Sequence, residues 1–205
     1  MAREIGISKI HFFPLKSDTG LAPTYNQAIP IKWAVSLETE NQYSEGEYFA
    51  DNVIEKAVKQ ISSVEVTLEV SSNLPPATEA KITGQGYENG RKFVRVGQNA
   101  PSGALAYEIS LDDGTCRKRV LYNVALTKNK SKNATQEDKI EGETFEFEGV
   151  AIPLVSTGDV ELLMDEKEIK AMASNTETLK AFNEFFTTVV LPTGQATIAN
   201  QLQNK

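Results

Sequence analysis

Apolar and polar residues alternate along much of the first 165 residues, which is the pattern of β-strands with one buried and one exposed face. The stretch SVEVTLEV at residues 63–70 alternates throughout. Its four aliphatic side chains share one face, and Glu65, Thr67 and Glu69 share the other. Weaker patterns predict further strands over residues 5–13, 29–37 and 159–164.

The stretch GETFEFEG at residues 142–149 repeats this arrangement with aromatic rings. As a strand, it places Phe145 and Phe147 on one face. The residues of the opposite face are Thr144, Glu146 and Glu148. Burial explains the position of the rings. The acidic face is either an ordinary solvated surface or a surface that the protein uses.

Turn residues separate the strands into hairpins. Asn89-Gly90 can adopt the positive φ angles of a tight two-residue turn, and residues 112–114 have a similar role between two long strands. A helix of about two turns is expected between the strand at residues 63–70 and the hairpin that turns at Asn89-Gly90. Asn73 is its expected cap, two prolines suit its first turn, and Gly84 suits its end.

Two polar segments, residues 38–53 and 127–142, lack a clean period and are predicted to be long exposed loops. For residues 38–46, an exposed arm is the alternative to a loop. The pattern changes again near residue 166. Residues 174–177 form a capping box, and a helical stripe follows it. The stripe consists of Leu179, Phe182, Phe185 and Phe186.

The predicted organisation is therefore a β-domain over residues 1–165 and a C-terminal helix with an arm over residues 166–205. The fold class is mainly β: an antiparallel β-sandwich or barrel with one short flanking helix and a C-terminal helical extension.

Composition narrows the possible partners and compartments. The chain has 205 residues and a formal charge of -7, so it has no general attraction for a nucleic-acid backbone. No apolar run approaches the length of a membrane span, and the first residues lack the features of a secretory leader. We therefore expect a protein that stays in a cytoplasm, or is released by lysis. Cys116 is the only cysteine, and a packing role is favoured over a reactive thiol.

The residues do not assemble into a catalytic group. The single histidine, His11, lies inside a predicted strand, and one His with one Cys cannot build a usual zinc site. The glutamates repeat in rows along strands, without the flanking aromatic platform of a glycosidase. We expect no enzymatic activity, no cofactor and no metal. The only tryptophan, Trp33, falls in a predicted hydrophobic strand, which weakly disfavours a sugar-binding module.

Four segments together resemble the major tail tube proteins of bacteriophages with long non-contractile (siphovirus-type) tails. They are EYFADN at residues 47–52, the strand and helix at 63–84, the hairpin at 104–126, and the polar loop that runs into ETFEFEGVAIPL. Their order and spacing match over about residues 3–165. Phe49 is inserted in a loop that otherwise resembles "YADN", and residues after 166 have no matched counterpart.

The resemblance implies a β-sandwich with a flanking helix. Six copies would close into a ring, and stacked rings would form a tube through which DNA leaves the virion. The implied partners are the chain itself and other tail proteins, such as the tape measure, tail terminator and distal tail proteins, with no membrane. The implied location is the virion tail, assembled in the host cytoplasm.

With this resemblance, the two acidic faces become candidates for the lumen wall. The candidate lumen-facing residues are Glu65, Thr67, Glu69, Thr144, Glu146 and Glu148. The long loops become candidates for contacts between subunits or between rings. These candidate contact residues are Tyr48, Phe49, Asp51, Asn52, Lys128, Lys130 and Lys132. The alternative hypothesis is a monomeric β-sandwich binding module of the adhesin or carbohydrate-binding type.

Overall fold

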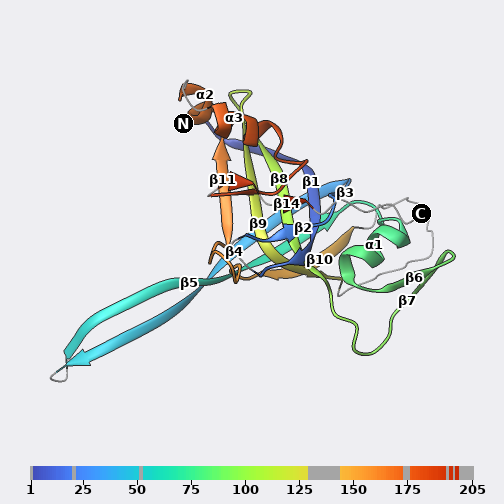
Figure 1. Cartoon of the computed structure of the whole chain (residues 1–205), viewed down its shortest axis with the longest axis horizontal. Coiled ribbons are helices and arrows are strands. Elements are labelled where there is room, and N and C mark those ends of the chain that lie inside the picture. The colour runs from blue at the N-terminus through green and yellow to red at the C-terminus, as the bar shows by residue number, and fades with distance from the viewer. Residues whose placement is uncertain are drawn as a thin grey trace, which may run out of the picture.

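The protein is mainly β, as predicted, and most of its strands belong to one curved sheet (Figure 1). The structure, a computed structural model, describes residues 2–19, 22–50, 53–128, 144–172, 176–192, 194–195 and 197–198. Within these residues, ten strands form the main sheet in the order β14-β2-β1-β8-β9-β10-β5-β4, with β3 added to β1 and β11 added to β9. All of its pairs are antiparallel except β14 with β2.

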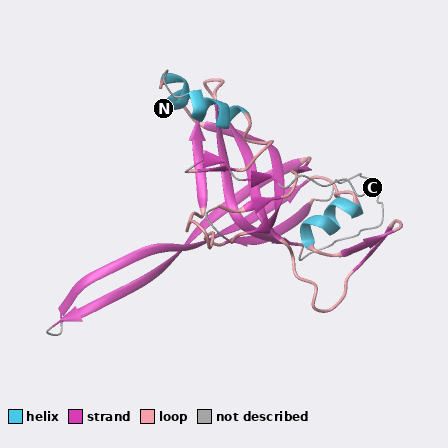
Figure 2. Cartoon of the chain, in the orientation of Figure 1, coloured by secondary structure: helices cyan, strands magenta, loops and turns pink. Residues whose placement is uncertain are grey.

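Strands make up most of the described elements, and the helices are few and short (Figure 2). The strands of the main sheet are β1 (Glu4–Ser17), β2 (Thr24–Tyr25), β3 (Ile29–Ile31), β4 (Ala34–Ala50), β5 (Val53–Val70), β8 (Ser102–Leu111), β9 (Cys116–Thr127), β10 (Phe145–Ala151), β11 (Glu161–Asp165) and β14 (Thr197–Ile198). Two separate hairpins are β6 (Gly86–Glu88) with β7 (Arg91–Phe93), and β12 (Val190–Leu191) with β13 (Gly194–Gln195). The helices are α1 (Pro76–Thr83), α2 (Glu166–Ala171) and α3 (Thr176–Asn183).

The sheet buries apolar residues on both of its faces, which produces two cores. In β8, Leu105 and Tyr107 belong to the first core, whereas Ala104 and Ala106 belong to the second. The first core also holds the aliphatic row of β5, Phe147 of β10 and residues near α1. The second lies under the C-terminal segment. The central strands are therefore buried on both sides, as their near-continuous burial shows.

The strand predicted over residues 29–37 is interrupted, because the chain turns sharply between β3 and β4. Trp33 has φ 66°, a left-handed conformation that is rare for a bulky residue. The turn lets β3 pair with β1 while β4 pairs with β5, at the far side of the sheet. The Trp33 side chain is 71% exposed, so its predicted place in a hydrophobic strand is wrong, and so is the argument against sugar binding drawn from it.

The loop predicted over residues 38–53 is also wrong, because residues 38–50 belong to β4. This strand pairs with β5 along almost its whole length. Beyond residue 42, however, the hairpin extends away from the rest of the sheet (Figure 1). Residues 43–46 of β4 are all exposed. A strand segment without a buried face does not alternate in hydrophobicity, which is why its sequence has the character of a loop. The second predicted loop, residues 127–142, lies largely outside the described residues.

The short helix α1 forms where it is predicted, between β5 and β6. It begins after Pro75, with no side-chain cap, so the expected capping role of Asn73 is wrong. It ends at Gly84, whose φ of 72° is the left-handed conformation expected there. The buried Ile82 attaches the helix to the first core.

The C-terminal segment packs closely against the second core. Phe182 of α3 is buried there, as is Phe185, but the predicted helical stripe ends early because α3 stops at Asn183. Two buried polar groups of β9 bond to this segment: Lys118 Nζ donates to Phe182 O at 2.7 Å, and Tyr122 Oη donates to Val190 O at 2.6 Å. Of the predicted capping box, the structure describes only residues 176 and 177, at the start of α3.

Candidate functional site

The two acidic strand faces predicted from the sequence are neighbours on one surface of the sheet. β10 pairs directly with β5, and Glu146 lies opposite Glu69 while Glu148 lies opposite Thr67. Thr144 is exposed just before β10 begins. The other side of the same two strands carries Phe147 and the aliphatic row of β5, which are buried in the first core. We call the solvent side of β4, β5 and β10 the acidic face.

β4 adds two carboxylates to the acidic face that the sequence analysis missed. Glu38 lies opposite Thr67, and Glu40 lies opposite Glu65. Both are exposed. Their spacing of two residues, with Ser36 two residues earlier, was a usable signal, but it was hidden by the prediction of a loop. The acidic face therefore comprises Glu38, Glu40, Glu65, Glu69, Glu146 and Glu148, with Ser36 and Thr67 among them.

Like charges face each other across this surface. Glu40 opposes Glu65, and Glu69 opposes Glu146, in the direct register of antiparallel strands. Such pairs destabilise a sheet by roughly 0.2–1 kcal/mol each. Ser36 Oγ donates a hydrogen bond to Glu69 Oε2 at 3.1 Å, which satisfies part of one carboxylate. Burial of the aliphatic side of β5 holds the strands together in spite of this repulsion.

The distal part of the β4–β5 hairpin, residues 43–62, projects from the body, and we call it the arm (Figure 1). β10 accompanies β5 only over Val64–Val70, so the arm is a ribbon of two strands. At its base Tyr43 and Ile61 lie opposite each other and are 47% and 45% exposed. Lys59 Nζ lies 4.7 Å from the centre of the Tyr43 ring.

The predicted contact residues fall into three groups. Tyr48 and Phe49 belong to β4 near the tip of the arm. Asp51, Asn52, Lys130 and Lys132 lie outside the described residues. Lys128 is described.

The ammonium of Lys128 is engaged within its own chain. It donates to Asn73 Oδ1 at 2.9 Å and lies 3.5 Å from Glu79 Oε1, as well as 4.6 Å from the centre of the Phe145 ring. Glu79 is buried and also accepts from Lys92 Nζ at 2.7 Å. These contacts fasten α1 to β7 and to the end of β9.

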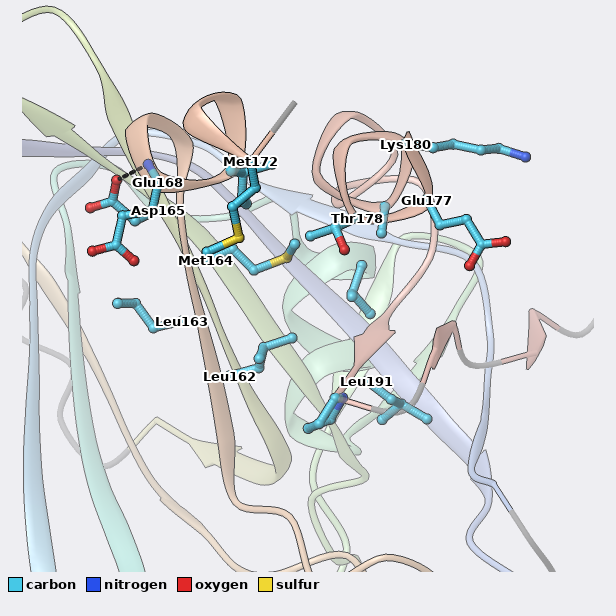
Figure 3. A pocket seen from close by; sticks show the side chains of 14 residues that line it. Leu162, Leu163, Met164, Asp165, Glu168, Met172, Glu177, Thr178, Lys180 and Leu191 are labelled. Carbon is cyan, nitrogen blue, oxygen red and sulfur yellow. Dashed lines mark hydrogen bonds between the residues drawn. The ribbon is translucent and has the colours of Figure 1, made fainter. Parts of the chain in front are cut away.

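A groove of about 700 Å³ lies between β11, the two C-terminal helices and β12 (Figure 3). Its lining is mixed. Leu162, Met164 and Met172 provide apolar surface, and Glu168 and Glu177 provide carboxylates. No group of three or more potential metal ligands occurs among the residues that the structure describes.

The two side chains that could take part in catalysis, those of His11 and Cys116, are partly buried and contact neighbouring residues. His11 Nδ1 lies 2.8 Å from Lys9 O, and its ring lies 5.1 Å from that of Phe186. Burial, together with the neighbouring Glu166 carboxylate, raises the pKa of the Cys116 thiol to about 11. At neutral pH this thiol is protonated and a poor nucleophile.

No family model matches the chain, and no curated protein matches it. Among solved structures, the cryo-EM structure of the anti-feeding prophage cap (AFP tube terminating cap) has a TM-score of 0.40 with 10% sequence identity, over 80% of this chain and 95% of that one. No helix within the described part of the chain is long and apolar enough to cross a membrane. The acidic face and the arm are therefore the features from which function is inferred.

Proposed function

We propose that the chain is a structural subunit that assembles with copies of itself into stacked rings, forming a tube of the kind found in siphovirus-type phage tails. The observation that carries this proposal is the arm. An isolated two-stranded hairpin is marginally stable in water, because it has no sheet or helix against which to bury a face. A long ribbon that leaves its own body is best explained by a surface on another molecule that supports it.

The edge of the main sheet supports self-assembly as well. β4 is the last strand of the sheet, so its outer backbone groups pair with no strand among the described residues. A long open edge invites pairing with another chain. The opposite end of the sheet, at β14 and β3, offers a different edge. Two different edges favour a head-to-tail contact, which closes into a ring when the rotation between copies permits.

The acidic face suits the wall of a conduit for DNA. Each phosphate that pairs with a lysine or arginine adds a favourable contact, which must break again as the duplex moves. Carboxylates make no such pairs, and their repulsion keeps the duplex within a water layer. Glu38, Glu40 and Glu65 are exposed on this face and act in this way. The proposed subunit has no enzymatic role, needs no cofactor, and has other tail proteins as partners in the virion.

Electron microscopy of negatively stained, concentrated protein tests assembly directly. We expect rings or tubes of constant diameter, and a dispersed monomer at every concentration would contradict the proposal.

The proposal that the acidic face lines the lumen has a separate test. We expect tubes of a Glu38→Lys/Glu40→Lys variant, assembled with duplex fragments, to protect DNA from nuclease, whereas wild-type tubes do not.

A matched variant controls for general charge effects in the nuclease test. Glu168→Lys/Glu177→Lys makes the same change in charge at two exposed positions outside the acidic face. DNA bound there would lie on a surface open to nuclease. Equal protection by both variants would show that the acidic face does not line the lumen.

The exposed Trp33 favours one alternative, a monomeric binding module for carbohydrate. Exposed aromatic side chains are the usual platforms for binding partners, and this indole is 71% exposed at the turn between β3 and β4. Because it is the only tryptophan, its fluorescence reports on any ligand that covers it. A stable monomer whose emission shifts with added oligosaccharides would favour this alternative over the tube.

A further inference from the structure

The two most extended parts of the molecule lie at opposite ends of its long axis. The arm forms one end, and α1 with the β6–β7 hairpin forms the other (Figure 1). We call residues 84–101, which contain β6, β7 and the loop after them, the basic loop. No single copy can bring its own arm to its own basic loop across this distance.

The basic loop exposes apolar side chains in a defined conformation. Val94 is 71% exposed, and Val96 is fully exposed. The main chain around them is ordered by Gln98, whose Oε1 accepts from Arg95 N at 2.8 Å and whose N donates to Arg95 O at 3.2 Å. The loop thus presents two valines to solvent and does not fold them onto the body, which is typical of a binding surface.

The base of the basic loop is fixed to the body. Gly84 packs so closely against Asn99 that a Cβ on the glycine would lie 2.1 Å from Asn99 O. On the hairpin, Lys92 Nζ bonds to the buried Glu79 of α1. Arg95 lies over the Phe93 ring, with 4.6 Å between its guanidinium carbon and the ring centre. A partner would therefore meet a surface that is already organised.

The charges of the arm and the basic loop are opposite. The basic loop contains Arg91, Lys92 and Arg95 against the single carboxylate Glu88, and because Lys92 pairs with Glu79, its positive charge toward a partner comes from the two arginines. The arm contains four carboxylates and two lysines: Glu45, Glu47, Asp51, Glu55, Lys56 and Lys59. Glu45 and Lys59 pair with each other at 2.6 Å, and the arm as a whole keeps a net negative charge. Each surface also exposes apolar side chains, which at the base of the arm are Tyr43 and Ile61. Both electrostatic attraction and apolar burial would favour contact between them.

We propose that the arm of one copy docks on the basic loop of the next copy. The inference rests on the proposed self-assembly and adds which two surfaces meet. Because the contact joins two different surfaces at opposite ends of the chain, it repeats from copy to copy and propagates an assembly. It also supplies a support for the two-stranded arm, which pairs with no third strand in the part of the chain that the structure describes. The charged part of the contact weakens as salt is added.

Charge reversal on each side, followed by recombination, tests the pairing. We expect Arg91→Glu/Arg95→Glu to lower the assembled fraction at least tenfold in sedimentation, and Glu45→Lys/Glu47→Lys to do the same. A chain carrying all four substitutions is expected to recover most of the assembly, because the charges are exchanged between the two surfaces. Lys16→Glu/Lys180→Glu lowers the net charge by the same amount as Arg91→Glu/Arg95→Glu, at exposed positions elsewhere, and is expected to assemble as the wild type does.

A second variant separates docking from folding. Val96 is fully exposed, so Val96→Ser leaves the monomer as stable as the wild type, and we expect it to reduce assembly. If both reversed variants form tubes at the wild-type yield, the docking inference is overturned while the proposed function stands. If all four substitutions together fail to restore assembly, the pairing of these surfaces is overturned. A wild-type protein that never assembles overturns both.

Discussion

Glu40 on β4 lies directly opposite Glu65 on β5, and both carboxylates are exposed. Opposed like charges oppose the pairing of the two strands. The strands remain together because β5 buries its aliphatic residues on the other side of the sheet. The pair therefore does not serve the stability of the monomer, which agrees with a role for the acidic face in the assembled protein.

Neutralising one member of this pair is expected to stabilise the monomer. We expect Glu40→Gln to raise the free energy of unfolding by up to about 0.5 kcal/mol at low ionic strength, because it removes one repulsion. The gain should shrink with added salt, since both groups are exposed. Urea unfolding at two salt concentrations measures it. Lower stability at low salt would show that the carboxylates do not repel each other appreciably.

Shortening the arm is expected to abolish assembly without unfolding the body. Tyr43 and Ile61 face each other in register, so a two-residue Asn-Gly turn can replace residues 44–60. The described residues of the deleted part make no ladder with any strand outside the hairpin, and both cores keep their residues. We expect a cooperatively unfolding monomer by circular dichroism and no tubes by microscopy. Tubes of normal diameter from this variant would remove the arm from the assembly contact.

The buried carboxylate of Glu79 is expected to matter for stability. It accepts from Lys92 and lies near Lys128, so it links α1 to two separate parts of the chain. Replacing it with alanine leaves two lysines without this partner and is expected to cost about 2 kcal/mol. Lys81→Ala, at an exposed position on the same helix, should cost far less. Chemical unfolding compares them, and equal stabilities would show that this ion pair contributes little.

Acid is expected to weaken the attachment of α2. A hydrogen bond from Arg117 holds the pKa of Asp165 below its ordinary value, and the same side chain caps α2 by accepting from Lys167 N and Glu168 N. A carboxyl whose pKa is depressed in the folded state stabilises that state above its ordinary pKa, near 3.8, and loses this contribution as pH falls through the folded-state value.

Asp165→Asn keeps a cap but removes the charge. We therefore expect the wild type to be more stable than this variant above about pH 5, with the difference vanishing toward pH 2. Thermal unfolding across this range measures the difference, and Glu177→Gln, at an exposed position on α3, serves as the control. A difference that does not change with pH would show that the ionised form has no special role.

Several elements could be predicted because their causes are local. The alternation at residues 63–70 produces the end of β5, and Phe147 is buried as expected. The turn at Asn89-Gly90 has φ angles of 47° and 79°, which follow from what these residues tolerate. The acidic side of two strands was also visible, since side chains in a strand alternate.

Which strand pairs with which depends on contacts between segments that are far apart in the sequence. Residues 43–46 of β4 are all exposed, and neighbouring residues alone could not distinguish such a strand from a loop. That Glu38 and Glu40 join the acidic face follows from the register of β4 with β5, which the turn at Trp33 makes possible.

By itself, the sequence determined the strand periods, the turn positions and the acidity of two strand faces, because these depend on the conformational preferences of neighbouring residues. Only the tertiary structure decided which strands adjoin, that three of them share one acidic face, and that the hairpin leaves the body. Those features depend on which apolar surfaces are buried together across long separations along the chain.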